Sequence, residues 1–578
     1  MRFWFGVFLF ALVARMASAF SPYYDAGQPL RWDFNSTTLD PRLFNKTTKA
    51  IRFYIGKTYS DVNRTAELNA VRAAIGQWQA IPGTILKFEE AGFAPADLQD
   101  AKIDGTNSIF WTTNAFVGGV DMTSRAAYTQ VVLDAQNHVV EADTALNARI
   151  FSWFTDVNNT NSGAQLVEAV VAHEIGHFLG LDHTPLGGGT VINGGPGICP
   201  EFGLSSDEIA AARFLYPATP SQIGTISGFV HMNGVGIHGA IVTAETAQGI
   251  AISATASDSA GNYKLPALPP GAYNVHVSPM DPDTADAFSS IFRPSDIAGD
   301  FGAATTAFLA TENSATTVTS GATTTLNFNV TSGQPAFRIQ QIGKPTALAA
   351  APSPVRYGVG VNRGQTLYVG ASGATIPATA TLSITGDGIT VNSTTFQANR
   401  FYGVGGIAAQ NLVWAQITIS DSATPGLRTI VVRNGTDVAY ANGYFEIYPP
   451  VYDYNFDGLD DRFQRQYFAV FTAPEAAPGA DPDGDHFSNA FEALTGSDPT
   501  NALSFNFLIQ QVDIIRGAPR VTWKSDVGKQ YQLYGKGDVA GAAWQTIGSP
   551  VTATTNLTSQ SDPTGTGVIQ FYKLKLLP

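Results

Sequence analysis

Three of the eight histidines in the chain lie within the stretch VAHEIGHFLGLDH. His173 and His177 are four residues apart, so on a helix they share one face and can reach one metal ion. Gly180 allows a left-handed residue that ends the helix, and the turn then brings His183 toward the same ion. Three nitrogen ligands leave a fourth position for water, as in catalytic zinc sites rather than closed structural ones.

Glu174 follows the first of these histidines and would lie close to the ion without needing to bind it. Zinc lowers the pKa of a bound water toward about 7 and polarises a scissile carbonyl. Glu174 would then act as general base, taking a proton from the zinc-bound water and passing it to the leaving amine. Two other interpretations stay open. The histidines could be incidental groups on a helix surface, or Cys199 could close a structural site as a fourth ligand.

The elements that must position these side chains are a motif helix and a sheet beside it. AQLVEAVVAHEIGHFLG predicts a helix over 164–180 that ends at a glycine. In TAELNAVRAAIGQWQAI large apolar residues recur every three or four positions, which predicts an amphipathic helix over 65–81. A third helix over 205–217 opens with a capping box and stops at a proline. Strands such as IRFYIG, and a hairpin made by AAYTQVVLD and HVVEADTALN, complete a β/α region.

The motif and these elements resemble the metzincin zinc metalloproteases, and most closely their matrixin branch. The resemblance covers residues 50–217 and implies an α+β (α/β sandwich) catalytic domain that holds one zinc ion. It also implies an endopeptidase whose cleft lies between the sheet and the motif helix. The edge strand of the family, which here corresponds to Ala127–Leu133, holds substrate as an added β-strand.

Three features depart from the pattern of that family. No methionine lies between His183 and Pro217, where the family places one below the zinc, and Val191 and Ile192 stand in that neighbourhood. An aliphatic residue could pack there without loss of catalysis. No cysteine precedes the motif, so latency by a cysteine switch is not expected. His138 is the only histidine upstream of the motif, which predicts that the second, structural zinc of vertebrate matrixins is absent.

The N-terminal stretch MRFWFGVFLFALVARMASAF predicts a secretory signal over 1–19, with a basic start, an apolar core and a small-x-small cleavage site. Its apolar core is too short for a membrane anchor, and no other stretch is long enough to span a bilayer. The net charge is −14 and no basic cluster is visible, which argues against nucleic-acid binding. A single cysteine excludes an internal disulfide, and Cys199 is expected to be a small, partly buried apolar residue.

After the β/α region helices nearly vanish, and alternating strands with Gly and Pro turns indicate β-sandwich modules. The first module resembles the carboxypeptidase regulatory-like domain, through the D-x-x-G-x-Y turn of Asp258, Gly261 and Tyr263. The next module resembles an immunoglobulin-like sandwich by composition alone. We expect a signal peptide at 1–19, an irregular segment at 20–49, the catalytic domain at 50–217, β-sandwiches at 221–332 and 335–449, a calcium-loop segment at 451–503 and a C-terminal β module at 504–578.

The segment at 451–503 places oxygen-bearing residues at positions 1, 3, 5, 9 and 12 of EF-hand-type calcium loops. It resembles the calcium repeats of dockerins and thrombospondin-type linkers, which implies structural Ca²⁺ in a short stalk. Gln464 replaces the bidentate glutamate of the first loop, and His486 replaces the turn glycine of the second. Asx-rich turns without an ion remain the alternative. The candidate ligands are Asp453, Asn455, Asp457, Asp461, Asp481, Asp483, Asp485, Asn489 and Glu492.

These observations favour a secreted zinc endopeptidase with β accessory domains. The alternative is a catalytically inactive extracellular adhesive or binding protein on a protease scaffold, which the missing methionine and the large β region keep open. A carbohydrate-associated protein is a third hypothesis, because calcium loops of this kind accompany polysaccharide machinery. We expect a protein or peptide substrate, contact with a cell surface or matrix through the β modules, no nucleic acid, no membrane span and a monomer.

Overall fold

A computed structural model describes two compact units, Met1–Pro450 and Val451–Pro578. The predicted signal at 1–19 and Cys199 lie outside the described residues. Those described are 24–25, 28–60, 64–158, 164–187, 190–192, 203–218, 222–282, 292–294, 297, 301, 303–344, 354–355, 358–400, 409–502, 504, 509–537, 544–564 and 571–577.

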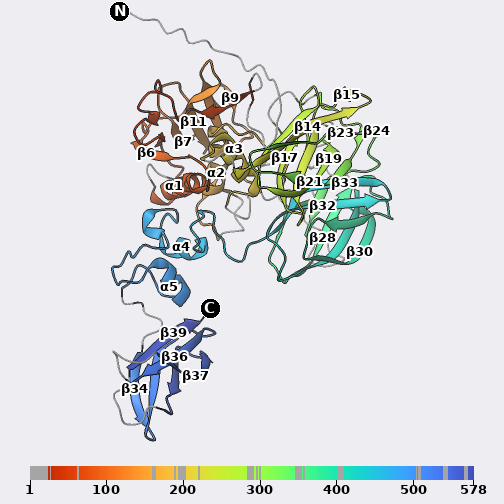
Figure 1. The fold of residues 1–578 in the computed structure, drawn as a ribbon. Coiled ribbons are helices and arrows are strands. Elements are labelled where there is room, and N and C mark those ends of the chain that lie inside the picture. Colours follow the sequence, from red (N-terminus) through yellow and green to blue (C-terminus); the bar gives the residue numbers. More distant parts are fainter. Residues whose placement is uncertain are drawn as a thin grey trace, which may run out of the picture. The chain divides into compact units, whose positions relative to one another are not determined.

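The main sheet of the first unit has the strand order β10-β11-β7-β5-β4, with β3 paired to β11 and β6 paired to β5 (Figure 1). β10 is antiparallel to β11, whereas β11, β7, β5 and β6 run parallel to one another. β10 ends the strand order and so lies at the edge of the sheet, the position that the resemblance implies for Ala127–Leu133. The bounds are β3 (Arg31–Trp32), β4 (Phe44–Asn45), β5 (Ala50–Ile55), β6 (Phe88–Phe93), β7 (Ser108–Thr112), β10 (Ala127–Leu133) and β11 (His138–Asn147).

Short two-stranded pairs flank this sheet. They are β1 (Tyr24–Asp25) with β2 (Gln28–Pro29), β8 (Phe116–Val117) with β9 (Val120–Asp121), and β12 (Trp153–Phe154) with β13 (Gln165–Leu166). The β12–β13 pair takes up the two residues just before the motif helix. That helix therefore begins later than the sequence predicts.

Three helices accompany the sheet: α1 (Thr65–Ala80), α2 (Val167–Phe178) and α3 (Ser206–Leu215). α2 ends near the predicted residue, because Gly180 adopts the left-handed φ of 94° that only glycine takes without strain. α3 begins with the predicted capping box. The Ser205 side chain accepts a hydrogen bond from the backbone N–H of Glu208, and the Glu208 side chain accepts one from the backbone N–H of Ser205.

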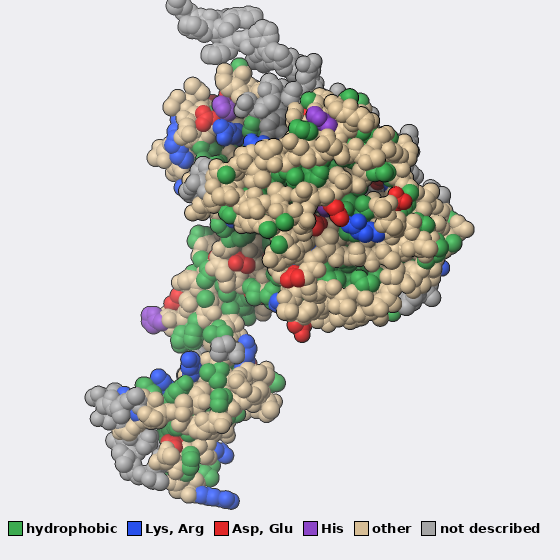
Figure 2. Space-filling model, turned by 45° about the vertical axis from the view of Figure 1, so that its right-hand side comes forward, with side chains coloured by type: hydrophobic (Ala, Val, Ile, Leu, Met, Phe, Trp, Pro, Cys, Tyr) green, Lys and Arg blue, Asp and Glu red, His purple; other side chains and the backbone are tan. Residues whose placement is uncertain are grey.

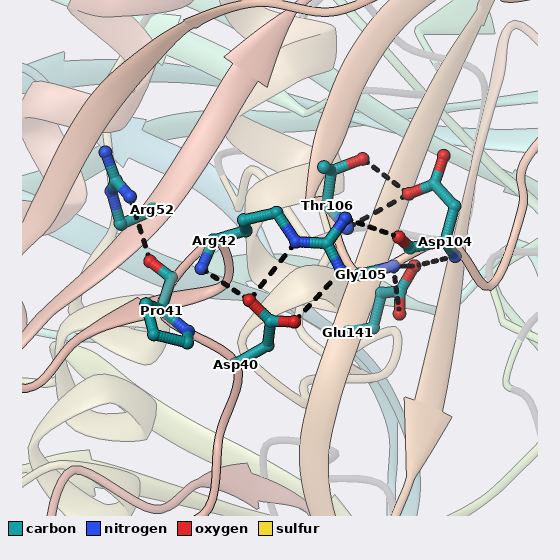
Figure 3. A network of polar contacts seen from close by, with 8 residues as sticks. All are labelled: Asp40, Pro41, Arg42, Arg52, Asp104, Gly105, Thr106 and Glu141. Carbon is teal, nitrogen blue, oxygen red and sulfur yellow. Dashed lines mark hydrogen bonds and ion pairs between the residues drawn. The ribbon is translucent and has the colours of Figure 1, made fainter. Parts of the chain in front are cut away.

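A polar network ties the N-terminal segment and the loop before β7 to the sheet (Figure 3). Glu141 on β11 accepts hydrogen bonds from the backbone N–H groups of Asp104, at 2.7 Å, and Gly105, at 3.0 Å. Arg42 pairs with Asp40 at 2.9 Å and donates to the Asp104 carbonyl at 3.1 Å. Among the described residues of the segment over 20–49, β3 pairs with β11 and β4 pairs with β5, so this segment contributes two strands to the sheet.

The rest of the first unit is built from paired sheets. In one module the sheet around β14 faces β17-β16-β19-β21, and β20 pairs with β24; both sheets contribute to a core that includes Ile226, Val242 and Tyr273. The bounds are β14 (Gly224–Met232), β15 (Val235–Gly236), β16 (Ala240–Thr246), β17 (Ala251–Ala256), β18 (Asn262–Leu268), β19 (Gly271–Pro279), β20 (Phe308–Leu309), β21 (Thr311–Val318), β22 (Thr323–Thr325), β23 (Phe328–Asn329) and β24 (Thr331–Ser332).

The following module packs β26-β25-β28-β31-β30 against β27-β33-β32-β29, around a core that includes Val369, Val413 and Phe445. Two antiparallel-rich sheets over one shared core make each module a β-sandwich. The bounds are β25 (Gln341–Gly343), β26 (Pro354–Val355), β27 (Val359–Val361), β28 (Thr366–Gly373), β29 (Thr381–Ile384), β30 (Ile389–Arg400), β31 (Gln410–Ile419), β32 (Gly426–Asn434) and β33 (Asp437–Ile447).

The second unit opens with α4 (Asp461–Tyr467), the 3-10 turn η3 (Pro474–Ala476) and α5 (Asn489–Thr495). Two three-stranded sheets follow, β34-β35-β38 and β37-β36-β39, over a core that includes Trp523 and Tyr531. Their bounds are β34 (Ile509–Ile515), β35 (Ala518–Lys524), β36 (Gln530–Lys536), β37 (Gln545–Thr552), β38 (Leu557–Ser561) and β39 (Phe571–Leu577).

Charged side chains stand singly or in small groups on the face shown in Figure 2, where no extended basic surface gathers among the described residues. This agrees with the small charged fraction of the sequence, 14%. Among the described residues, none of the helices combines the length and the apolar character that a membrane crossing needs.

Candidate metal centre and active site

The three histidines of the motif come together at the end of α2. His173 and His177 lie one turn apart on the helix, and their Nε2 atoms are 3.1 Å apart. The turn at Gly180 brings the His183 ring to within 5.2 Å of the His173 ring and 5.0 Å of the His177 ring, centroid to centroid. One nitrogen from each ring lies within 4.8 Å of the others. Three converging imidazole nitrogens are a donor set that fits zinc.

The other nitrogens of two of these rings are already held by backbone carbonyls. His173 Nδ1 lies 2.7 Å from the Val191 carbonyl, and His177 Nδ1 lies 2.7 Å from the Leu181 carbonyl. A carbonyl can only accept, so each Nδ1 carries the hydrogen and each Nε2 keeps its lone pair. Both rings are therefore fixed in the tautomer and orientation that a metal ion needs.

The surroundings also keep these rings neutral. Burial, and then the neighbouring His177, lower the pKa of His173 to about 4. Burial likewise lowers the pKa of His177. A neutral imidazole is the ligating form, so no proton has to be removed near pH 7 before a cation binds.

Glu174 is buried beside the histidines and is oriented by the edge strand. Thr129 on β10 donates its hydroxyl to Glu174 Oε2 at 2.6 Å, and the same hydroxyl lies 2.9 Å from that of Thr144 on β11. Burial raises the pKa of Glu174, and the neighbouring His173 and the Thr129 hydrogen bond lower it in part. A carboxylate with a raised pKa next to a cation site is suited to accept and return a proton.

Ile192 lies against the motif helix where the sequence lacks the methionine of the metzincin pattern. A Cβ at Gly176, the residue directly before His177, would overlap the Ile192 side chain. Both backbone polar groups of Ile192 are hydrogen-bonded. The Ile192 N–H donates to Glu208 Oε1 at 2.8 Å, and the Ile192 carbonyl accepts from the Thr184 N–H at 2.9 Å. An isoleucine thus packs closely against the motif helix at Gly176.

The C-terminal end of α2 is anchored by aromatic side chains from distant parts of the chain. The Trp32 indole donates to the Phe178 carbonyl at 2.9 Å, and the Tyr216 hydroxyl donates to the Leu179 carbonyl at 2.6 Å. These carbonyls would otherwise lack partners at the helix end. The helix is also tied to α1, because the Trp78 indole donates to the Ala172 carbonyl at 2.9 Å.

The loop after His183 is held by the β-sandwich that ends the first unit. The Gly187 N–H donates to the Asn442 carbonyl at 2.8 Å, and a Cβ at Gly187 would overlap the Tyr444 ring. Leu186 is buried in a cluster whose other members come from both β-sandwiches, namely Ala251, Ala254 and Leu427. The loop that leaves the metal centre is therefore shaped by three modules rather than by the catalytic one alone.

The acidic segment forms two loops in the second unit. In the second loop, one carboxylate oxygen from each of Asp481, Asp483 and Asp485 lies within 4.8 Å of the others. Asn489 and Glu492, from the first turns of α5, are buried. In the first loop Asp461 and Gln464 are buried on α4, and the other candidate ligands Asp453, Asn455 and Asp457 are partly buried.

Several positioning residues have no signal in the sequence. Thr129 and Trp32 are single residues in segments without a motif, and their roles depend on contacts across 45 and 146 positions. The sequence predicts Glu208 as a capping residue, but its second role, holding Ile192, depends on the fold. His138 pairs with Asp134 at 3.3 Å and lies on β11, away from the motif in sequence.

Comparison with known proteins agrees with this geometry. Residues 44–216 match the family model described as Matrixin, and residues 225–331 match that of the carboxypeptidase regulatory-like domain. No curated protein matches the chain significantly.

Among solved structures, BcpA, the major pilin subunit of Bacillus cereus, is 10% identical, with 39% of this chain and 68% of that chain covered and a TM-score of 0.13. Fervidolysin from Fervidobacterium pennivorans, a keratinolytic enzyme related to subtilisin, is 12% identical, with 59% of this chain and 54% of that chain covered and a TM-score of 0.15. TM-scores this low do not indicate a shared fold.

The family matches and the metal centre concern the same part of the chain. The matrixin family is zinc-dependent, and the three histidines that can hold a metal ion lie inside the matched residues. Residues 44–216 are therefore a matrixin domain, of the metzincin metalloprotease type, and residues 225–331 are a carboxypeptidase regulatory-like domain.

Proposed function

We propose that this protein is a zinc-dependent endopeptidase that acts outside the cell, with His173, His177 and His183 as zinc ligands and Glu174 as general base. The observation that carries the proposal is the convergence of three imidazoles beside one buried carboxylate. When bound, zinc supplies a Lewis acid that acidifies water and polarises the substrate carbonyl.

The residues of the chain supply the rest of the chemistry. Thr129 holds Glu174 Oε2, which leaves Oε1 to take a proton from the attacking water and deliver it to the leaving amine. The backbone carbonyls behind His173 and His177 keep the rings from rotating. Each of these groups is in place before substrate arrives, so little reorganisation is needed during the reaction.

The substrate would bind along β10. In the described residues this strand is hydrogen-bonded on one side only, to β11, and lies at the edge of the sheet next to α2. An extended peptide can add to such an edge through its own backbone groups, which aligns the scissile bond without dependence on sequence. Side-chain preference would then come from the loop after His183.

The proposal is tested by cleavage of an unfolded protein by the full chain and by Glu174→Gln. We expect Glu174→Gln to keep its zinc and lose about 10²–10⁴-fold in rate, the usual contribution of a general base. Glu168→Gln is the matched control, since Glu168 is buried on the same helix and bonds Gln77 at 2.7 Å. It should keep its rate. Zinc-loaded wild type without cleavage of any substrate would instead favour an inactive adhesive protein.

Export is part of the proposal and is supported by the predicted signal over 1–19. Expression in a secreting host should yield protein whose N-terminus is Phe20. Retention of the first nineteen residues on mature protein would contradict it. The division into seven segments, and contact with a cell surface or matrix through the β modules, belong to the same proposal.

We also propose that the segment over 451–503 binds Ca²⁺ as a structural ion. What supports this is the set of aspartates brought together in its second loop and the preference of Ca²⁺ for six to eight oxygen ligands. Equilibrium dialysis of the full chain against calcium would test it, and a chain that takes up no calcium would contradict it.

A further inference from the structure

The two acidic loops of the second unit have almost the same backbone. Position 4 is left-handed in both, at Phe456 (φ 56°) and Gly484 (φ 77°), and so is position 6, at Gly458 (φ 86°) and His486 (φ 76°). His486 therefore adopts the conformation for which the pattern requires glycine. Its presence does not prevent the second loop from closing.

The first residue of each loop also makes the same bonds. Asp453 accepts hydrogen bonds from the N–H groups of positions 5 and 6, at 2.9 and 3.1 Å. Asp481 accepts from positions 5 and 6 of its own loop, at 3.2 and 2.9 Å. The loops are thus two copies of one backbone design, and any difference between them lies in the side chains that point inward.

In the first loop, amide groups satisfy the inward carboxylate. Gln464 at position 12 donates its Nε2 to Asp457 Oδ2 at 2.8 Å and to the Ala476 carbonyl at 2.9 Å. Asn455 donates to the same Asp457 oxygen at 3.0 Å and to Gln464 Oε1 at 3.1 Å. The two side-chain amides close the loop by supplying the hydrogen-bond donors that the carboxylate needs.

Among the described residues, no side-chain amide donates to the inward carboxylates of the second loop. Glu492 at position 12 is 1% exposed, and neither of its oxygens has a hydrogen-bond partner in the described part of the chain. Asn489 is fully buried and turns its amide nitrogen to the Glu475 and Ala477 carbonyls, which leaves Oδ1 without a partner. Asp483 Oδ2 and Asp485 Oδ2 are also buried and unpartnered.

The contrast between the loops is large. With partners counted over the described residues, the second loop holds five buried side-chain oxygens without a hydrogen-bond partner, whereas the first holds one, Asp461 Oδ1. An unpartnered buried oxygen costs about 1–3 kcal/mol, and a charged one more.

We infer that the two loops are not equivalent: the second, closed by Glu492, holds one Ca²⁺, and the first, closed by the Gln464 and Asn455 amides, holds none. This inference rests on the proposed calcium binding and specifies its site. A bidentate glutamate with three aspartates, an amide oxygen and the Phe487 carbonyl gives the oxygen-only, many-ligand shell that Ca²⁺ takes and Mg²⁺ does not need. The amide closure makes the first loop independent of ions.

The test counts calcium per chain in the full-length protein, after equilibrium dialysis in zinc-containing buffer. Wild type should bind one Ca²⁺. Glu492→Gln, which gives the second loop the closing amide of the first, should bind none. Gln464→Glu should bind two, because it completes the pattern D-x-[DN]-x-[DN]-G-x5-E in the first loop. The gain in that variant cannot arise from misfolding.

The outcomes separate the two proposals. No calcium in wild type would overturn the calcium-binding segment itself. Two ions in wild type would leave the segment standing and overturn the inequivalence of its loops. One ion in both wild type and Gln464→Glu would show that Gln464 is not the residue that prevents calcium binding in the first loop. Equal uptake when MgCl₂ replaces CaCl₂ would overturn the choice of ion.

Discussion

The metal centre of the first unit and the second acidic loop of the second unit treat their ligands in opposite ways. At the metal centre the ligand rings already bond the Val191 and Leu181 carbonyls, so they keep their places without an ion. In the acidic loop the buried oxygens of Glu492 have no hydrogen-bond partner within the part of the chain that the structure describes. Under the two proposals, the first site positions an ion for chemistry, whereas the second would depend on an ion for stability.

The largest effect is expected at the metal centre. Removal of zinc, or His177→Ala, should lower cleavage by about 10³-fold or more, since a metal supplies several kcal/mol of transition-state stabilisation. The fold of the domain should survive removal of the ion, because Trp32, Trp78 and Tyr216 still hold α2. Hydrogen exchange along α2 would check this. Loss of protection over the whole helix on zinc removal would contradict a preformed site.

Removal of calcium tests whether the second acidic loop depends on an ion. In calcium-free, zinc-containing buffer the second loop and α5 should lose protection from hydrogen exchange, while α4 should keep its protection. At a thousandfold excess of calcium over its dissociation constant the ion would contribute about 4 kcal/mol. Proteolytic activity is the internal control and should not change. Equal loss of protection in α4 and α5 would mean that the first loop also needs an ion.

A smaller effect is expected at the residue that orients the base. Thr129→Val removes the hydroxyl that bonds Glu174 Oε2 and should lower kcat/KM by about 10–100-fold with zinc content unchanged. Thr144→Val is the matched control, because Thr144 bonds only the hydroxyl of Thr129 among these residues. It should have a weaker effect. Equal losses in the two variants would indicate general damage to the sheet rather than orientation of Glu174.

The smallest expected effect concerns the loop after His183. Gly187→Ala would place a Cβ against the Tyr444 ring, and such overpacking costs about 1–3 kcal/mol. We expect a change of peptide preference with zinc content retained, measured with a peptide library. Tyr444→Ala in the same chain should relieve the clash and restore much of the wild-type profile. An unchanged profile in Gly187→Ala would show that the β-sandwich does not shape this loop.

The sequence was sufficient to predict the local parts of the fold. His173 and His177 lie on one helix and Gly180 lies just past its end, so their spacing alone predicts that the histidine side chains converge. The Matrixin match covers the same residues. The hairpin of β10 and β11 and the capping box of α3 are equally local. Features that depend on distant contacts could not be predicted. Trp32 lies in a segment without periodicity, yet it anchors the end of α2.

The two acidic loops show a further limit of prediction from sequence. Each departs from the calcium pattern at one residue, Gln464 or His486, and the sequence does not say which departure matters. The structure separates them, because His486 adopts the backbone conformation of the missing glycine, whereas Gln464 inserts a donor where an ion would need an acceptor. The sequence likewise offers Val191 and Ile192 as aliphatic residues near the missing methionine, and the structure shows Ile192 packed against the motif helix at Gly176.

The most direct test of the central claim is the coordination shell of zinc in the full-length protein, measured by X-ray absorption at the zinc edge. Three imidazole nitrogens at about 2.0–2.1 Å and one oxygen, with a shell that changes on addition of a hydroxamate, are the predicted result. A sulfur at about 2.3 Å from Cys199, or a fourth protein ligand that leaves no exchangeable position, would contradict it.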